Sequence, residues 1–474
     1  MLGAWGVARH PCGWNEGWRI VIERLSRRRF VLASGAAAVA TSVGAGCSGG
    51  DDDAAGSDGA APAGGRADGS DAPVFDPSDW DSVRGQFRLS PDVAHFAAFV
   101  FASHPAPVRE AIARHRDGLD ADSDSYIAAN EVDSEIAVRE NAGQYLGAEP
   151  TDVALTDSTT MGLGLLYGGL RLEDGDEVVT TEHDFYATHE ALRLRAERTG
   201  VSVRRVALYD DPAAASADEM VSSVLDAVTP RTRAIAVTWV HSGTGVRLPA
   251  AELSEAVREQ ARTAGIEAPL VCLDGVHGLA AVDAEVGDLG VDFLSAGTHK
   301  WLFGPRGTGV LWGRRAAWER VDVAIPPFEP SSFEAWLNRT TPEPVPAGLR
   351  VSPGGYHTFE HRWALAEAFR FHLDIGRAAV VDRITEQATR LKEGLAAIDD
   401  VSVVTPMRPD LSAGIVCVDV EGVAPYGVVS TLRQAGYAVS IAPYPTPYVR
   451  FGPSIVTTPE QVDGLVAAVA DLRS

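Results

Sequence analysis

Short apolar runs alternate with amphipathic stretches along most of the chain. Runs of this kind, bounded by polar residues, are typical of buried strands, and they occur at residues 153–156, 177–181, 203–208, 234–240, 269–273, 291–296 and 310–312. Helical periodicity lies between or before them, at residues 107–116, 133–146, 218–228 and 249–264. Alternating strands and helices predict an α/β fold with a mostly parallel central sheet and a functional site at the carboxyl ends of its strands.

The pattern changes towards the C-terminus. Residues 324–351 are rich in Pro, Glu and aromatic residues, which predicts a loop over the mouth of the site. A long helix begins near Glu360, and a small α+β domain follows, with predicted strands at 401–404, at 414–420 and near Tyr448 and a closing helix at 459–472. We therefore predict an N-terminal arm and a large domain at residues 75–345, and a small C-terminal domain at 346–474.

The first 74 residues differ in composition from the rest. Residues 48–74 consist largely of Gly, Ala, Ser and Asp, which cannot bury enough apolar surface to fold, and they predict a disordered tether. Residues 1–47 form a leader in which Ser26-Arg27-Arg28-Arg29-Phe30 resembles a twin-arginine export signal. The alternative is a basic turn before a transmembrane helix, but the Ala- and Gly-rich run that follows is poor in large apolar residues.

The resemblance implies export by the twin-arginine machinery to the periplasm or the outer face of the membrane. Small residues precede Cys47, which suggests a lipid anchor at that cysteine; simple cleavage of the signal is the alternative. Because such signals lie close to the start of a precursor, a further hypothesis is that translation begins near Val21 and that residues 1–20 are not part of the protein.

Composition limits the choice of partners. The chain is 45% hydrophobic and 22% charged, as expected for a globular protein. Its net charge of −24 argues against nucleic acid as a partner. The four cysteines show no metal-ligand spacing, so no metal site is predicted. Cys272 and Cys417 fall in apolar strand-like runs, where we expect buried thiols.

Lys300 is the first candidate for catalysis. It is one of only two lysines among 41 basic residues, and it follows a predicted strand. Its neighbours Phe293, Trp301 and Phe303 disfavour a chance surface lysine. Unlike an arginine, a desolvated lysine can lose its proton and form a Schiff base. The other lysine, Lys392, lies on a predicted amphipathic helix, where we expect a solvated side chain.

Asp274 ends the apolar strand that precedes Lys300, and a carboxylate with a Schiff-base lysine is the arrangement that pyridoxal phosphate needs. Asp-x-x-His at 274–277, His-Lys at 299–300 and the glycine-rich run at 304–309 resemble class V aminotransferases, a family that includes cysteine desulfurases and the isopenicillin N epimerase type. Gly-Thr-His-Lys-Trp at 297–301 is most similar to the epimerase type. The resemblance implies PLP-transferase fold type I, the cofactor pyridoxal 5′-phosphate, an amino-acid substrate and a homodimer with sites at its interface.

The resemblance also implies how the cofactor phosphate is held. Ser158, Thr159 and Thr160 lie at a strand-to-helix turn, where hydroxyl groups and backbone N–H groups form an anion site. Hydroxyl residues are also common as plain helix caps, so this turn is a weak motif alone. Thr358 is implied to reach the phosphate of the neighbouring subunit.

Other residues are implied to contact the cofactor ring. His183, with Tyr186 as a substitute, would stack on the pyridine, and a plain turn histidine is the alternative. Ser242, with Thr244 close by, would contact the phenolic oxygen. The cofactor-binding set is completed by His277, Thr298 and His299, and the catalytic set by Lys300, Asp274 and His183.

Arg450 matches the arginine that binds the substrate α-carboxylate in the family; a surface ion pair is the alternative. Epimerisation, transamination and carbon–sulfur β-elimination share the first steps, and the sequence leaves this choice open. Cysteine desulfurases carry a nucleophilic cysteine upstream of this arginine, but residues 436–444 contain none, which argues against persulfide formation. A hypothesis of another class is an exported lipoprotein that keeps the fold for binding without catalysis.

Overall fold

The computed structural model describes residues 74–473. The predicted leader with Cys47, and the tether apart from Val74, lie outside the described residues. Within residues 74–473, no helix combines the length and the apolar character needed to cross a membrane.

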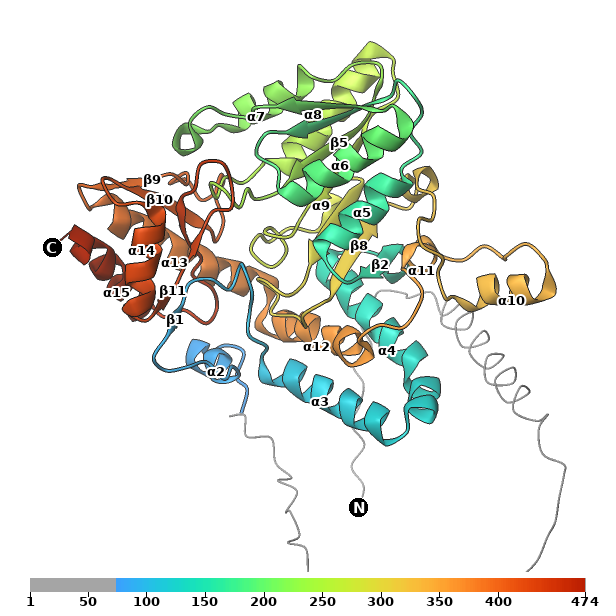
Figure 1. Cartoon of the computed structure of the whole chain (residues 1–474), viewed down its shortest axis with the longest axis horizontal. Coiled ribbons are helices and arrows are strands. Elements are labelled where there is room, and N and C mark those ends of the chain that lie inside the picture. The colour runs from blue at the N-terminus through green and yellow to red at the C-terminus, as the bar shows by residue number, and fades with distance from the viewer. Residues whose placement is uncertain (1–73, 474) are drawn as a thin grey trace, which may run out of the picture. The chain divides into compact units, whose positions relative to one another are not determined.

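The largest sheet has seven strands in the order β2-β8-β7-β6-β5-β3-β4. Three of them, β2, β5 and β8, are labelled in Figure 1. The strands are β2 (Val153–Thr156), β3 (Glu177–Thr181), β4 (Ser202–Val206), β5 (Thr232–Thr238), β6 (Leu270–Asp274), β7 (Phe293–Gly297) and β8 (Gly309–Gly313). β8 pairs antiparallel with β7 and β2, and the other pairings are parallel. The predicted mostly parallel sheet is confirmed, and β6 and β7 deliver Asp274 and Gly297 to the same edge.

Both faces of this sheet are covered by apolar side chains. Val237 and Leu273 enter one hydrophobic cluster, whereas their chain neighbours Ala236 and Cys272 enter another. Strand side chains alternate between faces, so this division shows packing on both sides. Helices α7 (Ala217–Leu225) and α8 (Ala250–Ala264) contribute to the first cluster, and α5 (Thr159–Gly169) and α6 (Tyr186–Thr199) to the second.

Three long helices pack against one another: α3 (Ala106–Ala121), α4 (Ser123–Leu146) and α12 (Phe359–Ile375). The helix that we predicted from residue 133 begins at Ser123, because Asp122 caps its first turn by accepting a hydrogen bond from the Ser125 N–H at 3.2 Å. It ends at Leu146, and the C-cap residue Gly147 has a φ of 65°, which glycine readily adopts.

The C-terminal elements form a second sheet, ordered β12-β13-β10-β9 and antiparallel throughout. These elements are α13 (Arg377–Ala396), β9 (Val401–Val403), β10 (Val416–Val420), α14 (Pro425–Gln434), β12 (Ser440–Ile441), β13 (Val449–Phe451) and α15 (Pro459–Ala470), coloured orange to red in Figure 1. The N-terminal arm carries α2 (Trp80–Gly85) and joins this part through β1 (Ala94–His95), which pairs in parallel with β11 (Tyr437–Ala438). The domain boundary at residues 345 and 346 stays a prediction.

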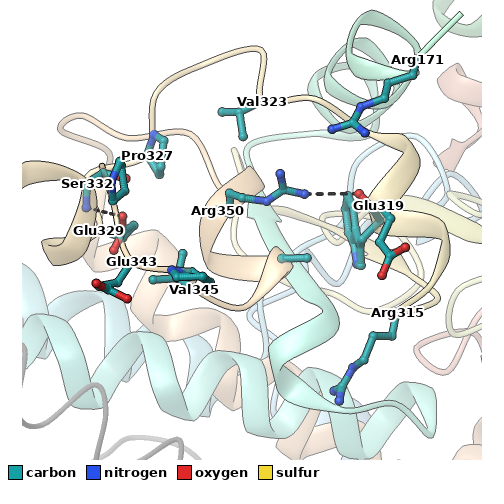
Figure 2. Close-up of a pocket in the computed structure, with 14 residues that line it drawn as sticks. Arg171, Arg315, Glu319, Val323, Pro327, Glu329, Ser332, Glu343, Val345 and Arg350 are labelled. Atoms are coloured by element: carbon teal, nitrogen blue, oxygen red, sulfur yellow. Dashed lines mark hydrogen bonds between the residues drawn. The ribbon is translucent and has the colours of Figure 1, made fainter. Parts of the chain in front are cut away.

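The predicted loop at 324–351 is not a plain loop, because it contains α10 (Pro330–Asn338) and α11 (Ala347–Val351). The Glu329 carboxylate caps α10 by accepting hydrogen bonds from two N–H groups of its first turn. A cavity of about 830 Å³ lies beside this segment, and Arg350 is among the residues that line it (Figure 2). The Arg350 guanidinium donates a hydrogen bond to the Trp318 carbonyl at 3.2 Å. None of the predicted site residues lines this cavity. The segment at 324–351 therefore borders a cavity that is separate from the predicted active site.

Gly278 provides a test of packing close to the end of β6. A Cβ atom at this position would lie 2.0 Å from Cε3 of Trp239. Gly278→Ala should therefore lower the free energy of unfolding by about 1–3 kcal/mol, as overpacking of a buried site does. Gly287→Ala, where a Cβ meets no atom within 4 Å, is the matched control and should not destabilise the protein. Thermal unfolding followed by circular dichroism measures both; equal midpoints would contradict the close approach.

Candidate active site

Lys300 follows the end of β7, and its amine lies 3.2 Å from Nε2 of His277. Burial lowers the pKa of Lys300 to about 8; the positive charge of Arg450 adds to this effect, and the Asp274 carboxylate opposes it. The lowered pKa raises the fraction of neutral amine at neutral pH, and the neutral amine is the form that acts as a nucleophile or a base.

The orientation of His277 supports a neutral amine at Lys300. The indole N–H of Trp301 donates to Nδ1 of His277 at 3.4 Å. Burial, with nearby positive charge, holds the pKa of His277 well below its usual range, so the ring is neutral and we infer that its proton is on Nε2. This N–H then points at the Lys300 nitrogen, which accepts it only when the amine is neutral.

Asp274 ends β6 and is 2% exposed. Its Oδ1 accepts a hydrogen bond from the Val276 N–H at 3.1 Å. Burial raises the pKa of Asp274 to about 6, and the negative charge of Asp184 acts in the same direction, whereas Lys300 and the bond from Val276 oppose it. At neutral pH the Asp274 side chain is therefore a buried, ionised carboxylate close to the Lys300 amine.

Sequence reasoning missed the second carboxyl group, Asp184. Its Oδ2 accepts hydrogen bonds from the Thr180 hydroxyl and the Thr181 N–H, both at 2.7 Å, and burial raises its pKa. The signal that sequence reasoning passed over is the Thr-Thr pair at the end of β3, a few residues before an aspartate.

His183 stacks on Tyr209, with ring centroids 3.9 Å apart and planes inclined by 16°. Its Nε2 accepts a hydrogen bond from the Leu208 N–H at 3.1 Å, and burial lowers its pKa to about 4. The Tyr209 hydroxyl lies 2.9 Å from Nδ1 of His241 and 2.8 Å from the Thr244 hydroxyl. His183 is therefore neutral and backed on one face by an aromatic ring that sequence reasoning missed.

The start of α5 meets the end of β7. Ser158 caps α5 by accepting from the Met161 N–H at 3.1 Å, and the Gly297 N–H donates to the Thr159 hydroxyl at 2.7 Å. Thr160 is exposed in the first turn. A Cβ atom at Gly297 would lie 3.0 Å from Cε1 of His299, so the glycine makes room for this ring.

This corner fits a bound phosphate. Nδ1 of His299 is buried and has no hydrogen-bond partner within the described chain, and it lies beside a helix N-terminus, where backbone N–H groups favour an anion. A phosphate would supply the missing partner. Together with the Asp274 carboxylate and the Lys300 amine, the residues present fit pyridoxal 5′-phosphate.

Two predicted cofactor residues are placed differently from the others. The Thr298 hydroxyl is engaged with the Thr308 carbonyl oxygen, at 3.1 Å, and the Thr308 hydroxyl, at 2.5 Å. Thr358 is exposed at the start of α12, where its carbonyl accepts from the N–H groups of His361 and Arg362. The structure therefore gives Thr298 a role in shaping the glycine-rich turn, and it leaves the Thr358 side chain on the surface of this chain.

Arg450 lies on β13 and is 6% exposed. Its Nη1 donates to the Ser242 carbonyl at 2.9 Å, its Nε donates to the Ser440 hydroxyl at 3.2 Å, and the guanidinium lies 5.0 Å from the Phe99 ring centroid. The Ser242 hydroxyl lies 2.9 Å from the Tyr444 hydroxyl. Arg450 is thus a buried cation bound to neutral groups, and the alternative of a surface ion pair is wrong.

The expectation of a solvated Lys392 is also wrong. Lys392 is 1% exposed, and its amine donates to the carbonyls of Pro406 and Met407 and to the Ser412 hydroxyl. The periodicity of its helix is amphipathic, but α15 and strands β9 and β10 pack against that helix and cover this side chain.

Comparisons with known proteins agree with this geometry. The family profile described as "Aminotransferase class-V" matches residues 121–443. The isopenicillin N epimerase of Streptomyces clavuligerus is 28% identical over 405 residues, which cover 83% of this chain and 98% of that protein. A probable cysteine desulfurase of Vibrio cholerae is 25% identical over 354 residues, covering 70% of this chain and 80% of that protein.

Solved structures show the same fold. A C-DES mutant with glycine covalently linked to its PLP cofactor has a TM-score of 0.73 at 20% identity, covering 82% of this chain and 99% of that one. The cystine C–S lyase C-DES in complex with cysteine persulfide has a TM-score of 0.72 at 20% identity, covering 80% of this chain and 98% of that one. The predicted PLP-transferase fold type I is therefore confirmed.

The pKa of Lys300 leads to a test with the cofactor as reagent. Capture of pyridoxal 5′-phosphate by cofactor-free protein should accelerate through a midpoint near pH 8, because the neutral fraction of the amine rises there. Asp274→Asn should move the midpoint to lower pH, because it removes the charge that raises this pKa. Stopped-flow absorbance gives the rates, and borohydride reduction with peptide mapping should place the label on Lys300, not Lys392. A midpoint near 10, typical of a free lysine, would contradict the role of burial.

Proposed function

Because the chain belongs to the aminotransferase class-V family and uses pyridoxal 5′-phosphate, we propose that it epimerises an amino acid at the α-carbon. The observation that carries the proposal is geometric: the Phe99 ring lies 5.0 Å from the Arg450 guanidinium and 6.2 Å from the His277 ring, and His277 lies 3.2 Å from the Lys300 amine, so a carboxylate-binding group and a proton-transfer base share one site. The similarity to the Streptomyces clavuligerus epimerase, 28% identical over 98% of that protein, supports epimerisation.

The protein's part in the reaction follows from its own side chains. Bound pyridoxal phosphate supplies an aldehyde for the substrate amine and an electron sink for the charge that develops at the α-carbon. Asp274, a carboxylate at neutral pH, would hold the proton of the pyridine nitrogen, and His183, neutral and backed by Tyr209, would support the ring. Ser158, Thr159, Thr160 and His299 would hold the phosphate.

Substrate recognition falls to Arg450, whose planar guanidinium binds the α-carboxylate through two parallel hydrogen bonds. This contact orients the bonds at the α-carbon. Lys300, with a pKa of about 8 near the working pH, would then take up the α-proton, and inversion follows when a proton is delivered to the opposite face of the α-carbon. His277, through Nε2, orients the amine, and Ser242 fixes Arg450 through its carbonyl. Inversion needs no further reactant.

The cysteines support a reaction without an enzyme-bound persulfide. Within the described residues the free cysteines are Cys272 and Cys417, and both are fully buried. Burial raises the pKa of Cys417 to about 12 and that of Cys272 well above its usual value, so neither thiol is a ready nucleophile. In the segment where a desulfurase carries its cysteine, this chain brings Tyr444 to the site.

Assembly and location complete the proposal. We propose a homodimer in which the exposed Thr358 approaches the partner's phosphate, as the family resemblance implies. We also propose export through the twin-arginine pattern at Ser26–Phe30, with Cys47 as a lipid anchor. Cell fractionation and mass spectrometry of the mature N-terminus test the export, and an unprocessed cytoplasmic chain would contradict it.

Epimerisation is tested with a panel of L-amino acids in D2O. An accepted substrate should exchange its α-proton and yield the D-isomer, measured by proton NMR and chiral chromatography. Lys300→Ala should abolish both signals. Arg450→Gln should raise KM about 10- to 100-fold, because a charge-assisted contact to the carboxylate is lost, whereas Arg390→Gln, at an exposed ion pair on α13, should change neither constant.

Other products would identify another reaction. A ketoacid would show transamination, and pyruvate with a released thiol would show β-elimination; either result as the main product would overturn epimerisation while keeping the role of Lys300. A protein that bound the cofactor and amino acids without exchange or product would support the non-catalytic binding lipoprotein.

Incubation with L-cysteine should leave no persulfide on Cys272 or Cys417, the two cysteines within residues 74–473, because both thiols are buried and protonated. Alkylation followed by mass spectrometry of the peptides measures this directly. A persulfide that disappears in Cys417→Ala or Cys272→Ala would contradict the proposal and restore the desulfurase reaction.

A further inference from the structure

Lys392 is a buried ammonium group at the centre of one loop. Its Nζ donates to the carbonyls of Pro406, at 2.8 Å, and Met407, at 3.0 Å, and to the Ser412 hydroxyl, at 2.8 Å. Three oxygen acceptors match the three N–H groups of an ammonium ion. We name residues 404–412 the lysine-bound loop.

The lysine-bound loop is joined to a turn of the active site, residues 241–247, which we name the serine turn. The Arg247 N–H donates to the Leu411 carbonyl at 2.9 Å, and the Thr405 hydroxyl donates to the Thr244 carbonyl at 2.6 Å. The first of these bonds belongs to an antiparallel β-bridge between Val246 and Ser412. The approach is close, because a Cβ atom at Gly245 would lie 2.5 Å from the Thr405 hydroxyl oxygen.

Residues of the serine turn also contact the side chains proposed to bind substrate and cofactor. The Ser242 carbonyl accepts from Nη1 of Arg450 at 2.9 Å, and its hydroxyl lies 2.9 Å from that of Tyr444. The Thr244 hydroxyl lies 2.8 Å from that of Tyr209, the ring that backs the stacked histidine. A continuous set of hydrogen bonds and packed backbone therefore leads from Lys392 to Arg450.

We propose that Lys392 is a positioning residue whose ammonium group holds the lysine-bound loop against the serine turn and thereby sets the position of Arg450. This inference rests on the proposed role of Arg450 in carboxylate binding. It also accounts for the choice of residue: among 41 basic residues only Lys300 and Lys392 are lysines. A compact ammonium satisfies three convergent oxygens, whereas the planar fork of a guanidinium does not.

The first test needs no substrate. Lys392→Met keeps most of the side-chain volume but removes the three donors, and Arg390→Met, at an exposed ion pair two positions earlier on α13, is the matched control. Hydrogen–deuterium exchange of the holoenzyme should be faster in Lys392→Met in both the lysine-bound loop and the serine turn, and unchanged in Arg390→Met. Faster exchange in the loop alone would overturn the connection to the site.

The second test measures substrate binding. Lys392→Met should raise KM for the accepted amino acid roughly 3- to 30-fold, with a smaller change in kcat and an unchanged visible absorbance of the bound cofactor. Affinity for the matching amine that lacks the carboxylate, from spectral titration, should not change. In the background of Arg450→Gln, Lys392→Met should have no further effect on KM, because both act on one contact.

Failure of the inference differs from failure of the proposed function. If Arg450→Gln raises KM and Lys392→Met does not, the positioning role is wrong while the function stands. If Arg450→Gln leaves KM unchanged, the proposed function is wrong. Should Lys392→Met not fold, Thr405→Val serves in its place, because it removes the hydroxyl that donates to the serine turn and keeps the side-chain shape; an unchanged KM there would overturn the inference.

Discussion

The removal of water from one amine governs the chemistry of this fold. An ammonium ion loses hydration free energy when it is buried, so the surroundings of Lys300 favour its neutral form. The Asp274 carboxylate raises the pKa of Lys300 and the Arg450 guanidinium lowers it, so these two side chains together determine how far burial shifts the amine towards its neutral form. The parallel pairing of β6 with β7 brings the two chain segments to one edge, and β13 adds the guanidinium.

Sequence reasoning predicted the central strands and placed three candidate side chains on or after them, whereas the catalytic roles of these side chains stay predictions. The central strands are buried on both faces, which makes each of them a continuous apolar run that is visible without structure. Asp274 and Lys300 follow such runs, and Arg450 is contained in a short one. The chemistry of a carboxylate and a lysine at strand ends singles out Asp274 and Lys300, whereas Arg450 was identified through its match to the family's carboxylate-binding arginine.

Sequence reasoning failed where a role depends on contacts between distant segments. Tyr209 and Tyr444 carry no local signal, and their partners are Thr244 and Ser242, which lie far from them in the chain. Lys392 was misplaced because helical periodicity reports one hydrophobic face and does not reveal what later packs over the other. The short helices at 324–351 were missed because their prolines, which begin α10 and precede α11, were taken as breakers.

The burial of Lys392 has a consequence for chemical labelling. The amine of Lys300 lies in the active site and Lys392 is 1% exposed, so no lysine offers a freely accessible target to acylating reagents. Modification of Lys392 must wait for a local opening that breaks its three hydrogen bonds. The rate at which Lys392 is acetylated therefore reports how often the structure around this side chain opens locally. Arginines do not react with the reagent, so they do not contribute to the signal.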